Sequence, residues 1–338
     1  MIDIKRNRYL DPIKEYWRES VKNFFINTDC HPYITFKNGK RRYFNSYLEK
    51  LKYECLQVVF DNTMNNKWLR KIYVRTLIYW WNQIDYIILV PPSVICSIVK
   101  IWDQRSGGSI QLQGILSKIF THYYERVSCK FGEELISKLN IKTCPYCNRQ
   151  FIYTYKGHSI ERPELDHFFP KAKYPLFCLS FYNLIPACHS CNHVKSSQKI
   201  GKNPYFSAFK GKFVLIDKKN CHKLNSSQIY RLSKNEIEID FEGCDGLEND
   251  NVKILGLKNV YNKHIDYIKE LIDKSMAYDE YAKKNLVESF QGVGYYPRQV
   301  YDFVWGRHLS DAEYEDRPLS KLTKDILDIL NIRRDEKR

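Results

Sequence analysis

Apolar residues in the first 140 positions recur at helical spacing. Within residues 11–25 they stand three or four positions apart, at Ile13, Trp17, Val21 and Phe24. Residues 67–85 and 110–127 show the same spacing, which is typical of helices that bury one face. The pattern predicts a helical N-terminal region over residues 1–140.

The pattern changes twice beyond this region. Residues 141–205 contain two cysteine pairs, four of the nine histidines and short extended stretches such as QFIYTY. After them, KFVLI and EIEIDF have the pattern of strands, and helical spacing returns from Val252 to the final stretch RPLSKLTKDILDILNI. We therefore predict an α+β protein that is mostly helical. A metal-binding module at 141–205 would be embedded in a helical body, with a C-terminal region at 206–338.

Composition narrows the class of protein and of partner. The 338 residues are 43% hydrophobic and 15% aromatic, which favours a folded chain, and the net charge of +15 favours nucleic acid as a partner over a membrane surface. The longest uncharged apolar run, residues 86–99, is shorter than the roughly 20 residues that span a bilayer. The first ten residues lack the apolar segment of a secretory signal. We expect a cytoplasmic protein with no membrane contact.

The cysteines indicate a metal site. The chain has eleven, an odd number, and most stand singly, so a reducing compartment is more consistent with them than a disulfide framework. Two Cys-x-x-Cys pairs separated by 40 residues have the spacing of a closed structural zinc site. They predict Zn²⁺ on Cys144, Cys147, Cys188 and Cys191. Four unligated thiols, or a mixed site that uses Cys178, His189 or His193, are the alternatives.

An Asp-His pair lies between the two cysteine pairs. Hydrolysis of a phosphodiester needs a base for water, to which neutral imidazole is suited, and a cation held by a carboxylate. His167 and Asp166 supply these two groups. Because adjacent strand residues point to opposite faces, the two can act together only if the backbone turns there.

The residues around this pair resemble the HNH nuclease motif, through ELDHFFPK, then YNLIPACHSC, then CNHVK. The family carries this motif on a ββα-metal core, which a structural zinc braces in many bacterial members. The resemblance implies that His167 is the general base and that Asp166 binds a catalytic divalent ion. It also implies that Asn183 orients the base through the intervening loop.

The third motif position is Asn192, where the family has a His or Asn metal ligand. One carboxylate and one amide form a set suited to Mg²⁺ or Mn²⁺, completed by water and substrate. His193 is the alternative ligand, but neighbours on a helix diverge by about 100°, so only one can face the metal, and Asn192 is favoured. Purely structural roles compete with these assignments: Asn192 would then cap a helix, and Asn183 would be a turn residue.

Several lysines are candidates for contact with nucleic acid. Lys195 stands where a basic residue of the family often approaches the scissile phosphate, and Lys171, Lys199 and Lys202 are further candidates. Residues 199–219 have six lysines and one acid, with aromatic residues between them. This composition suits a nucleic-acid groove, and a solvated surface with its aromatics in the core is the alternative.

The function predicted from the sequence is a metal-dependent HNH endonuclease that acts on DNA. The segments FFPKAKYPLF, SFYNLIPACHSCNHVK and RPLSKLTKDI resemble HNH proteins of bacterial antiphage systems, of the Septu type and its retron-linked relatives. The resemblance implies a nuclease effector in antiviral defence with an ATPase partner of the ABC or SMC kind. A non-catalytic, zinc-stabilised nucleic-acid-binding or adaptor protein, and an HNH nuclease acting on RNA, are the alternatives.

Overall fold

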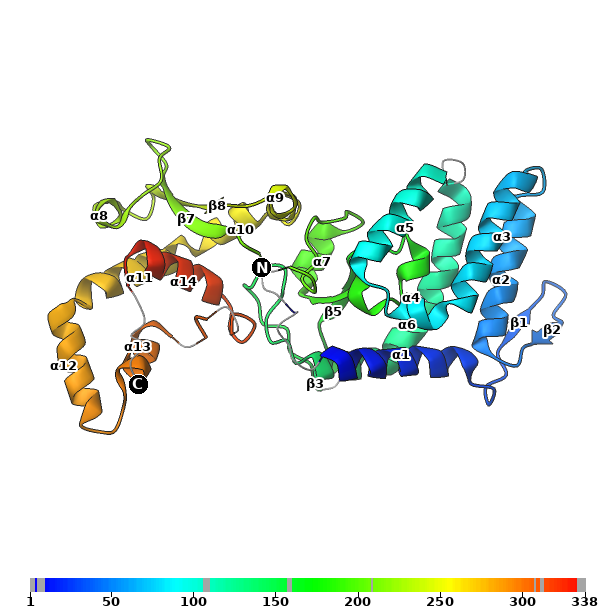
Figure 1. Cartoon of the computed structure of the whole chain (residues 1–338), viewed down its shortest axis with the longest axis horizontal. Helices are drawn as coiled ribbons and strands as arrows, with labels where there is room; N and C mark the ends of the chain where they lie inside the picture. The colour runs from blue at the N-terminus through cyan, green and yellow to red at the C-terminus, as the bar shows by residue number, and fades with distance from the viewer. Residues whose placement is uncertain are drawn as a thin grey trace. The chain divides into compact units, whose positions relative to one another are not determined.

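The computed structural model of the chain describes residues 4, 10–105, 110–156, 160–207, 209–306, 308–310 and 313–332 (Figure 1). Over these residues the protein is mostly helical with small antiparallel sheets, which confirms the coarse fold class predicted from the sequence. No helix in the described part of the chain is long and apolar enough to cross a bilayer.

The chain packs as two compact units, each built from segments that are distant in sequence. The N-terminal unit comprises Asn7–Ile141 and Tyr153–Lys199. The C-terminal unit comprises Met1–Arg6, Lys142–Ile152 and Ile200–Arg338. These units cut across the three consecutive regions expected from the sequence, because the residues of the expected module at 141–205 pack with two different parts of the chain.

In the part of it that the structure describes, the N-terminal unit contains a group of helices and six short strands, which pair as three two-stranded antiparallel sheets. Its helices are α1 (Leu10–Ile26), α2 (Tyr47–Asn62), α3 (Lys67–Asn82), α4 (Ile84–Ile88), α5 (Pro92–Arg105), α6 (Ile110–Leu139) and α7 (His189–Lys195). Its strands are β1 (Tyr33–Thr35), β2 (Arg41–Tyr43), β3 (Tyr155–Lys156), β4 (Ile160–Glu161), β5 (Glu164–His167) and β6 (Leu184–Ala187). Short 3₁₀ turns lie at Pro175–Phe177 and Phe181–Asn183.

Helices α1, α3 and α6 occur where the sequence predicts them. Helix α6 continues twelve residues beyond the predicted end, because buried Leu135, Ile136 and Leu139 extend its apolar face. The stretch QFIYTY contributes only an isolated bridge at Phe151 and the first residue of β3, so it is not the strand that its composition suggests.

Two buried tryptophans anchor the loop between β5 and β6 to the helices. Trp17 of α1 donates its indole N–H to the carbonyl of Leu179 over 2.8 Å, and Trp80 of α3 donates to the carbonyl of Leu176 over 2.6 Å. A buried indole N–H needs such a partner, so both rings fill the core and hold the loop. The helices thereby position residues 168–183, which lie directly between the two strands that carry the motif.

The C-terminal unit is built on the β7–β8 hairpin. Its strands are β7 (Lys212–Asp217) and β8 (Ile237–Glu242), which pair antiparallel as the pattern of KFVLI and EIEIDF predicts. Its helices are α8 (Ser226–Ile229), α9 (Gly246–Ile254), α10 (Leu257–Tyr261), α11 (Ile265–Ala277), α12 (Glu280–Gln291), α13 (Pro297–Trp305) and α14 (Ser320–Ile329), with a 3₁₀ turn at Asn262–His264. Helix α14 packs on β7, and its Asp325 accepts a hydrogen bond from the Phe213 amide over 2.9 Å.

Residues 142–152 belong to this unit through Asn148, which is fully buried. Its side-chain amide donates to the carbonyl of Tyr314 over 2.7 Å, and its backbone carbonyl accepts from Leu319 over 2.6 Å. Its φ of +46° lies in the left-handed region, which asparagine tolerates better than most residues. The first Cys-x-x-Cys pair is therefore packed against the segment that precedes α14.

Candidate functional site

The four paired cysteines converge. Their sulfur atoms all lie within 4.8 Å of one another and all four residues are buried. A tetrahedral zinc with Zn–S bonds of about 2.3 Å would separate its sulfurs by about 3.8 Å, so the cluster fits such an ion. None of the eleven cysteines forms a disulfide. The cluster that could hold a metal such as zinc consists of Cys144, Cys147, Cys188 and Cys191.

The alternative zinc ligands lie elsewhere. The Cys178 thiol is buried and donates to the carbonyl of Phe120 over 3.6 Å. His189 directs its Nδ1 to Glu164, and His193 is exposed on the surface of α7. The mixed sites considered from the sequence therefore have no counterpart in this cluster.

A hairpin followed by a helix carries the Asp-His pair. Strands β5 and β6 are antiparallel, with Asp166 opposite Ile185 and His167 opposite Leu184. Helix α7 begins directly after Cys188 and contacts β5. Because Cys188 is the N-cap, Asn192 lies inside α7 and does not cap it, which removes that alternative.

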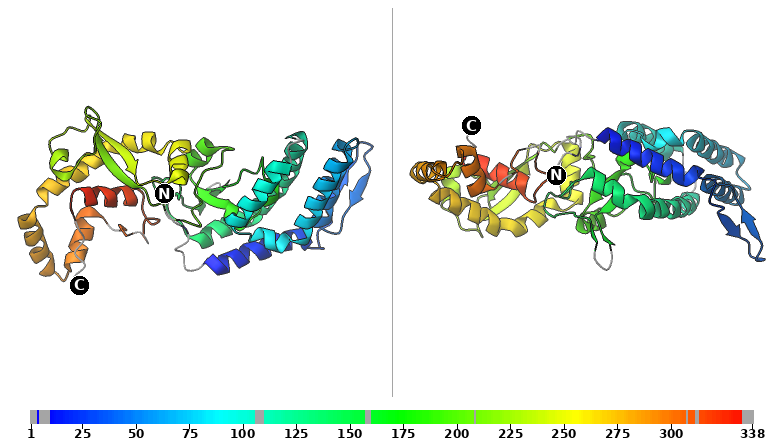
Figure 2. Two further views of the ribbon diagram at one scale, coloured as in Figure 1. Left: turned by 45° about the horizontal axis from the view of Figure 1, so that its top comes forward. Right: turned by 90° about the horizontal axis from the view of Figure 1, so that it is seen from below.

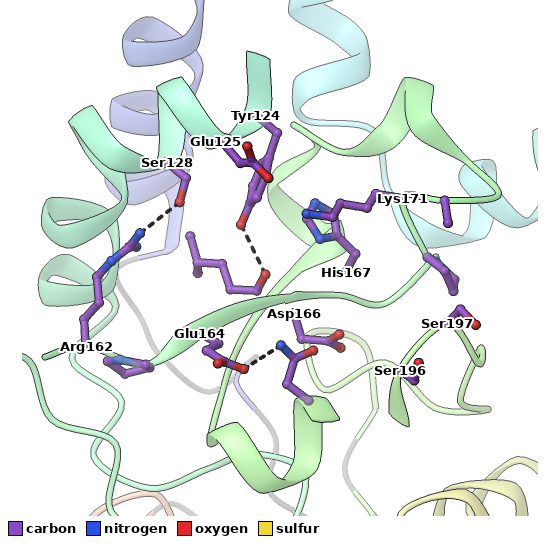
Figure 3. A pocket seen from close by; sticks show the side chains of 15 residues that line it. Tyr124, Glu125, Ser128, Arg162, Glu164, Asp166, His167, Lys171, Ser196 and Ser197 are labelled. Atoms are coloured by element: carbon purple, nitrogen blue, oxygen red, sulfur yellow. Dashed lines mark hydrogen bonds between the residues drawn. The ribbon is translucent and has the colours of Figure 1, made fainter. Parts of the chain in front are cut away.

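A pocket of about 520 Å³ lies where β5, α6 and α7 meet (Figure 3). It brings together four of the residues singled out from the sequence, Asp166, His167, Lys171 and Asn192. His193 does not line it, so the geometry favours Asn192 as the third motif residue. The other lining residues are Tyr124, Glu125, Ser128, Arg162, Pro163, Glu164, Leu165, Pro170, Ala172, Ser196 and Ser197.

Asp166 and His167 leave β5 on opposite sides, as their alternation requires. Asp166 faces α7, where it bonds to Lys195, and the His167 ring packs edge-on against Tyr124 of α6 at 4.4 Å between centroids. Both nevertheless line the same pocket, as do the other two residues of β5, Glu164 and Leu165 (Figure 3).

The surroundings of His167 determine the charge of its imidazole and which ring nitrogen carries the proton. Burial, helped by the nearby charge of Lys171, lowers the pKa of the imidazole to about 3, so the ring is neutral near pH 7. Its Nε2 lies 3.0 Å from the carbonyl oxygen of Cys178. A carbonyl can only accept a hydrogen bond, so Nε2 carries the proton and the basic lone pair is at Nδ1.

Asn183 fixes the loop that supplies this carbonyl. Its Oδ1 accepts from the Phe169 amide over 2.6 Å, and its Nδ2 donates to the carbonyls of Phe169 and Phe177 over 3.2 and 2.9 Å. The side chain is fully buried and does not reach the pocket. It therefore acts on His167 only through the backbone next to Cys178.

Lys195 occupies a different position from the one expected from the sequence. Its side chain is fully buried, and its Nζ donates to Asp166 Oδ1 over 3.0 Å and to the His167 carbonyl over 2.7 Å. A lysine held in this way cannot reach out to a phosphate. Because Lys195 lies on α7, these two hydrogen bonds join the helix to the end of β5.

Glu164 was not singled out by the sequence reasoning. Its carboxylate accepts from Asn192 Nδ2 over 2.6 Å and from His189 Nδ1 over 2.8 Å. Burial opposes its ionisation, but the hydrogen bonds from His189 and Asn192 prevail and lower its pKa. The available signal was the two-residue strand period, which places Glu164 on the same face as Asp166.

The remaining candidate lysines differ in their surroundings. Lys171 lines the pocket with its Nζ 5.0 Å from the ring centre of Tyr124, and Lys199 lies 5.0 Å from the ring centre of Phe169. Lys202 belongs to the C-terminal unit, where it forms ion pairs with Glu248 and Asp245 at 2.5 and 2.9 Å. Lys202 is thus engaged within its own unit.

The aromatics of the lysine-rich run 199–219 belong largely to the core. Tyr205 and Phe209 are buried, whereas Phe206 is partly exposed. Phe213 is buried as well, so three of the four aromatics of the run lie in the core, and the run lacks the row of exposed rings that a base-stacking groove requires.

Two pocket residues carry oxygen ligands of the kind that a hard divalent cation prefers. Asp166 and Asn192 both line the pocket and offer the carboxylate and amide oxygens that Mg²⁺ or Mn²⁺ prefers. Within the described ranges, the four cysteines are the only group of three or more His, Cys, Asp or Glu residues with converging ligand atoms. A cation in the pocket would consequently complete its shell with water and substrate oxygens.

Comparison of the chain with protein-family models, with curated proteins and with solved structures finds no match. The residues of the pocket and their contacts are therefore the basis for assigning a function.

Proposed function

We propose that this protein is a metal-dependent endonuclease of the HNH type that hydrolyses phosphodiester bonds in DNA. The observation that carries the proposal is a neutral imidazole, His167, that lines the same pocket as Asp166. The succession of β5, β6 and α7, followed along the motif, is consistent with a ββα-metal module. The zinc-binding cysteines would stabilise this module rather than take part in the chemistry.

Each pocket residue has a defined task in this mechanism. Asp166 and Asn192 would hold Mg²⁺ or Mn²⁺, which would supply positive charge to the scissile phosphate. His167 Nδ1 takes a proton from water while the water oxygen attacks phosphorus. The bond from phosphorus to the 3′-oxygen breaks, and that oxygen takes up a proton, which yields a 3′-hydroxyl and a 5′-phosphate. Lys171 adds positive charge at the rim of the pocket.

Supporting residues keep the base in its reactive form. The carbonyl of Cys178 fixes the tautomer of His167, and Asn183 fixes the loop that presents this carbonyl. Burial keeps the imidazole unprotonated, and a general base must be unprotonated to act. Glu164 orients Asn192 by accepting its amide N–H, which turns the amide oxygen away from Glu164.

The biological setting is part of the same proposal. The resemblance to HNH proteins of antiphage systems supports a role as the nuclease effector of bacterial antiviral defence, in the cytoplasm, beside an ABC- or SMC-type ATPase that restrains it. Co-purification of the chain with a separately tagged ATPase encoded next to it tests this part. A chain that cleaves without restraint and binds no ATPase would contradict it.

The test of the activity is cleavage of supercoiled plasmid by the purified protein with Mg²⁺ or Mn²⁺. We expect nicking by the wild type, none by His167→Ala, and retained nicking by the control His193→Ala, whose side chain lies outside the pocket. Single-stranded DNA and RNA substrates in parallel identify the preferred nucleic acid. Binding without cleavage under any metal would establish the non-catalytic alternative instead.

A further inference from the structure

A second surface of the N-terminal unit lies outside the pocket, on the β1–β2 hairpin. The hairpin projects beside α2 at one end of the unit (Figures 1 and 2). Its large aromatic side chains face solvent, with Tyr33, Phe36 and Tyr43 exposed by 43%, 41% and 59%. Exposed aromatic rings gathered in one small element indicate a binding surface.

The hairpin is also strongly cationic. Residues 30–43 contain Lys37, Lys40, Arg41 and Arg42 and no acidic residue. None of these four cations forms an ion pair within the part of the chain that the structure describes. The Arg41 guanidinium lies 4.7 Å from the ring centre of Tyr33, so positive charge and a flat ring are presented together.

A cationic pocket of about 450 Å³ lies at the base of the hairpin. It is lined by His31, Lys50 and Arg126, with Tyr33 and Tyr47 as aromatic walls, and no carboxylate lines it. The Arg126 guanidinium stacks 4.5 Å from the ring centre of Tyr47 and donates to its hydroxyl, which holds it in place. Lys50 also has Glu54 at 3.6 Å, on the side of α2 beyond the pocket. Such a pocket suits a phosphate group.

Helix α6 extends this charge along one face. Lys118, His122 and Arg126 recur every four residues, which places them in one row, and all three are exposed. Lys118 and His122 line another depression, of about 720 Å³, together with Ile34 and Phe36 of the hairpin. Glu54 also lines this depression, and it is the one carboxylate there. Residues of the hairpin therefore line both the pocket and the depression, and the basic row of α6 contributes Arg126 to the pocket and Lys118 and His122 to the depression.

We propose that this surface, made by residues 30–43, Lys50 and the basic row of α6, binds a single-stranded segment of nucleic acid. Phosphates would lie at the pocket of Lys50 and Arg126, and bases would stack on the exposed rings of the hairpin. The charge selects a polyanion, and the rings select one with accessible base faces, which a duplex conceals. An acidic peptide would satisfy the charge but leave the rings unexplained.

The proposal goes beyond the proposed cleavage activity and is tested separately from it. Binding is measured by fluorescence anisotropy with labelled 20-nucleotide single-stranded DNA, single-stranded RNA and duplex DNA, in a His167→Ala background so that cleavage cannot interfere. Absence of plasmid nicking by the wild type would refute the nuclease and leave these binding measurements interpretable. Absence of binding by the His167→Ala protein with its surface intact would refute this surface and leave the nicking assay interpretable.

Two kinds of variant separate charge from stacking. Lys50→Gln with Arg126→Gln keeps the apolar stems and removes two cations, so we expect single-strand affinity to fall about 10-fold at moderate salt, with a shallower salt dependence. Tyr33→Ala with Tyr43→Ala should weaken single-strand binding by about 5-fold or more, with the salt dependence unchanged. The matched control is Arg75→Gln, which removes an exposed arginine of α3 that lines neither of the two depressions beside the hairpin.

The outcomes decide the proposal. The proposal is supported if both kinds of variant lose affinity for single strands, while their thermal unfolding is unchanged and the Arg75→Gln control binds as the parent protein does. The ratio of RNA to DNA affinity then identifies the natural strand. Equal affinity for duplex and single strands with no effect of the tyrosine changes overturns it. Unchanged affinity in the Lys50 and Arg126 variant, or no binding of any of the three probes, overturns it as well.

Discussion

Lys195 Nζ donates a hydrogen bond to Asp166 Oδ1 over 3.0 Å, and the two side chains are 0% and 3% exposed. The pair joins the end of β5 to α7, and a second bond from Lys195 to the His167 carbonyl fixes the backbone of the Asp-His pair. The lysine supplies the positive charge that a buried carboxylate needs. In the proposed enzyme it would hold Asp166 in position for a cation.

Removal of the lysine should therefore destabilise the fold. Lys195→Met removes the lysine that pairs with buried Asp166, and loss of one member of a buried ion pair typically costs about 3–5 kcal/mol, measured as the free energy of unfolding in urea. In the double variant with Asp166→Asn, we expect a smaller loss than the sum of the two single losses, because the pair is removed together. Additive losses would show that the two side chains do not interact.

Glu164 should affect cleavage through Asn192. Glu164→Ala removes the acceptor of the Asn192 amide, so we expect activity to fall about 10- to 100-fold and the Mg²⁺ concentration for half-maximal activity to rise. Glu164→Gln retains an acceptor oxygen and should lose less. The control is Glu161→Ala, an exposed carboxylate on β4. An unchanged Mg²⁺ requirement in Glu164→Ala would contradict this role.

Asn183 should control the loop between β5 and β6. Asn183→Ala leaves the buried Phe169 amide without its acceptor and removes a donor from the Phe169 and Phe177 carbonyls, which we expect to cost about 2 kcal/mol or more. Amide hydrogen exchange at Phe169 should become faster, because its hydrogen bond is lost. Asn183→Asp keeps this acceptor, so it should retain more protection at Phe169. Equal exchange rates in the two variants would exclude this arrangement.

Zinc should be required for folding and should take no part in the chemistry. Cys188→Ser should abolish bound zinc, measured by elemental analysis, and lower the melting temperature, because metal binding contributes on the order of 10 kcal/mol to such folds. The control Cys129→Ser changes an exposed cysteine of α6 and should leave both quantities unchanged. A Cys188→Ser protein with full zinc content would refute the four-cysteine site.

Part of the fold could be predicted because its signals are local. The spacing of Ile13, Trp17, Val21 and Phe24 predicts α1, and all four residues are buried along it. The strand patterns of KFVLI and EIEIDF predict β7 and β8 in the same way, and the two strands pair. The grouping of residues 142–152 with the segment before α14 was not predictable, because it depends on hydrogen bonds between residues more than 160 positions apart.

The sequence by itself determined the chemical groups of the candidate site: two cysteine pairs at zinc spacing, an Asp-His pair and the asparagines that follow it. Only the tertiary structure decided how they are used. It buries Lys195 on Asp166, adds Glu164 as the partner of Asn192 and brings Tyr124 of α6 against His167. Periodic patterns record which face of an element is buried. The partner that each face meets is set by packing between segments that are far apart along the chain.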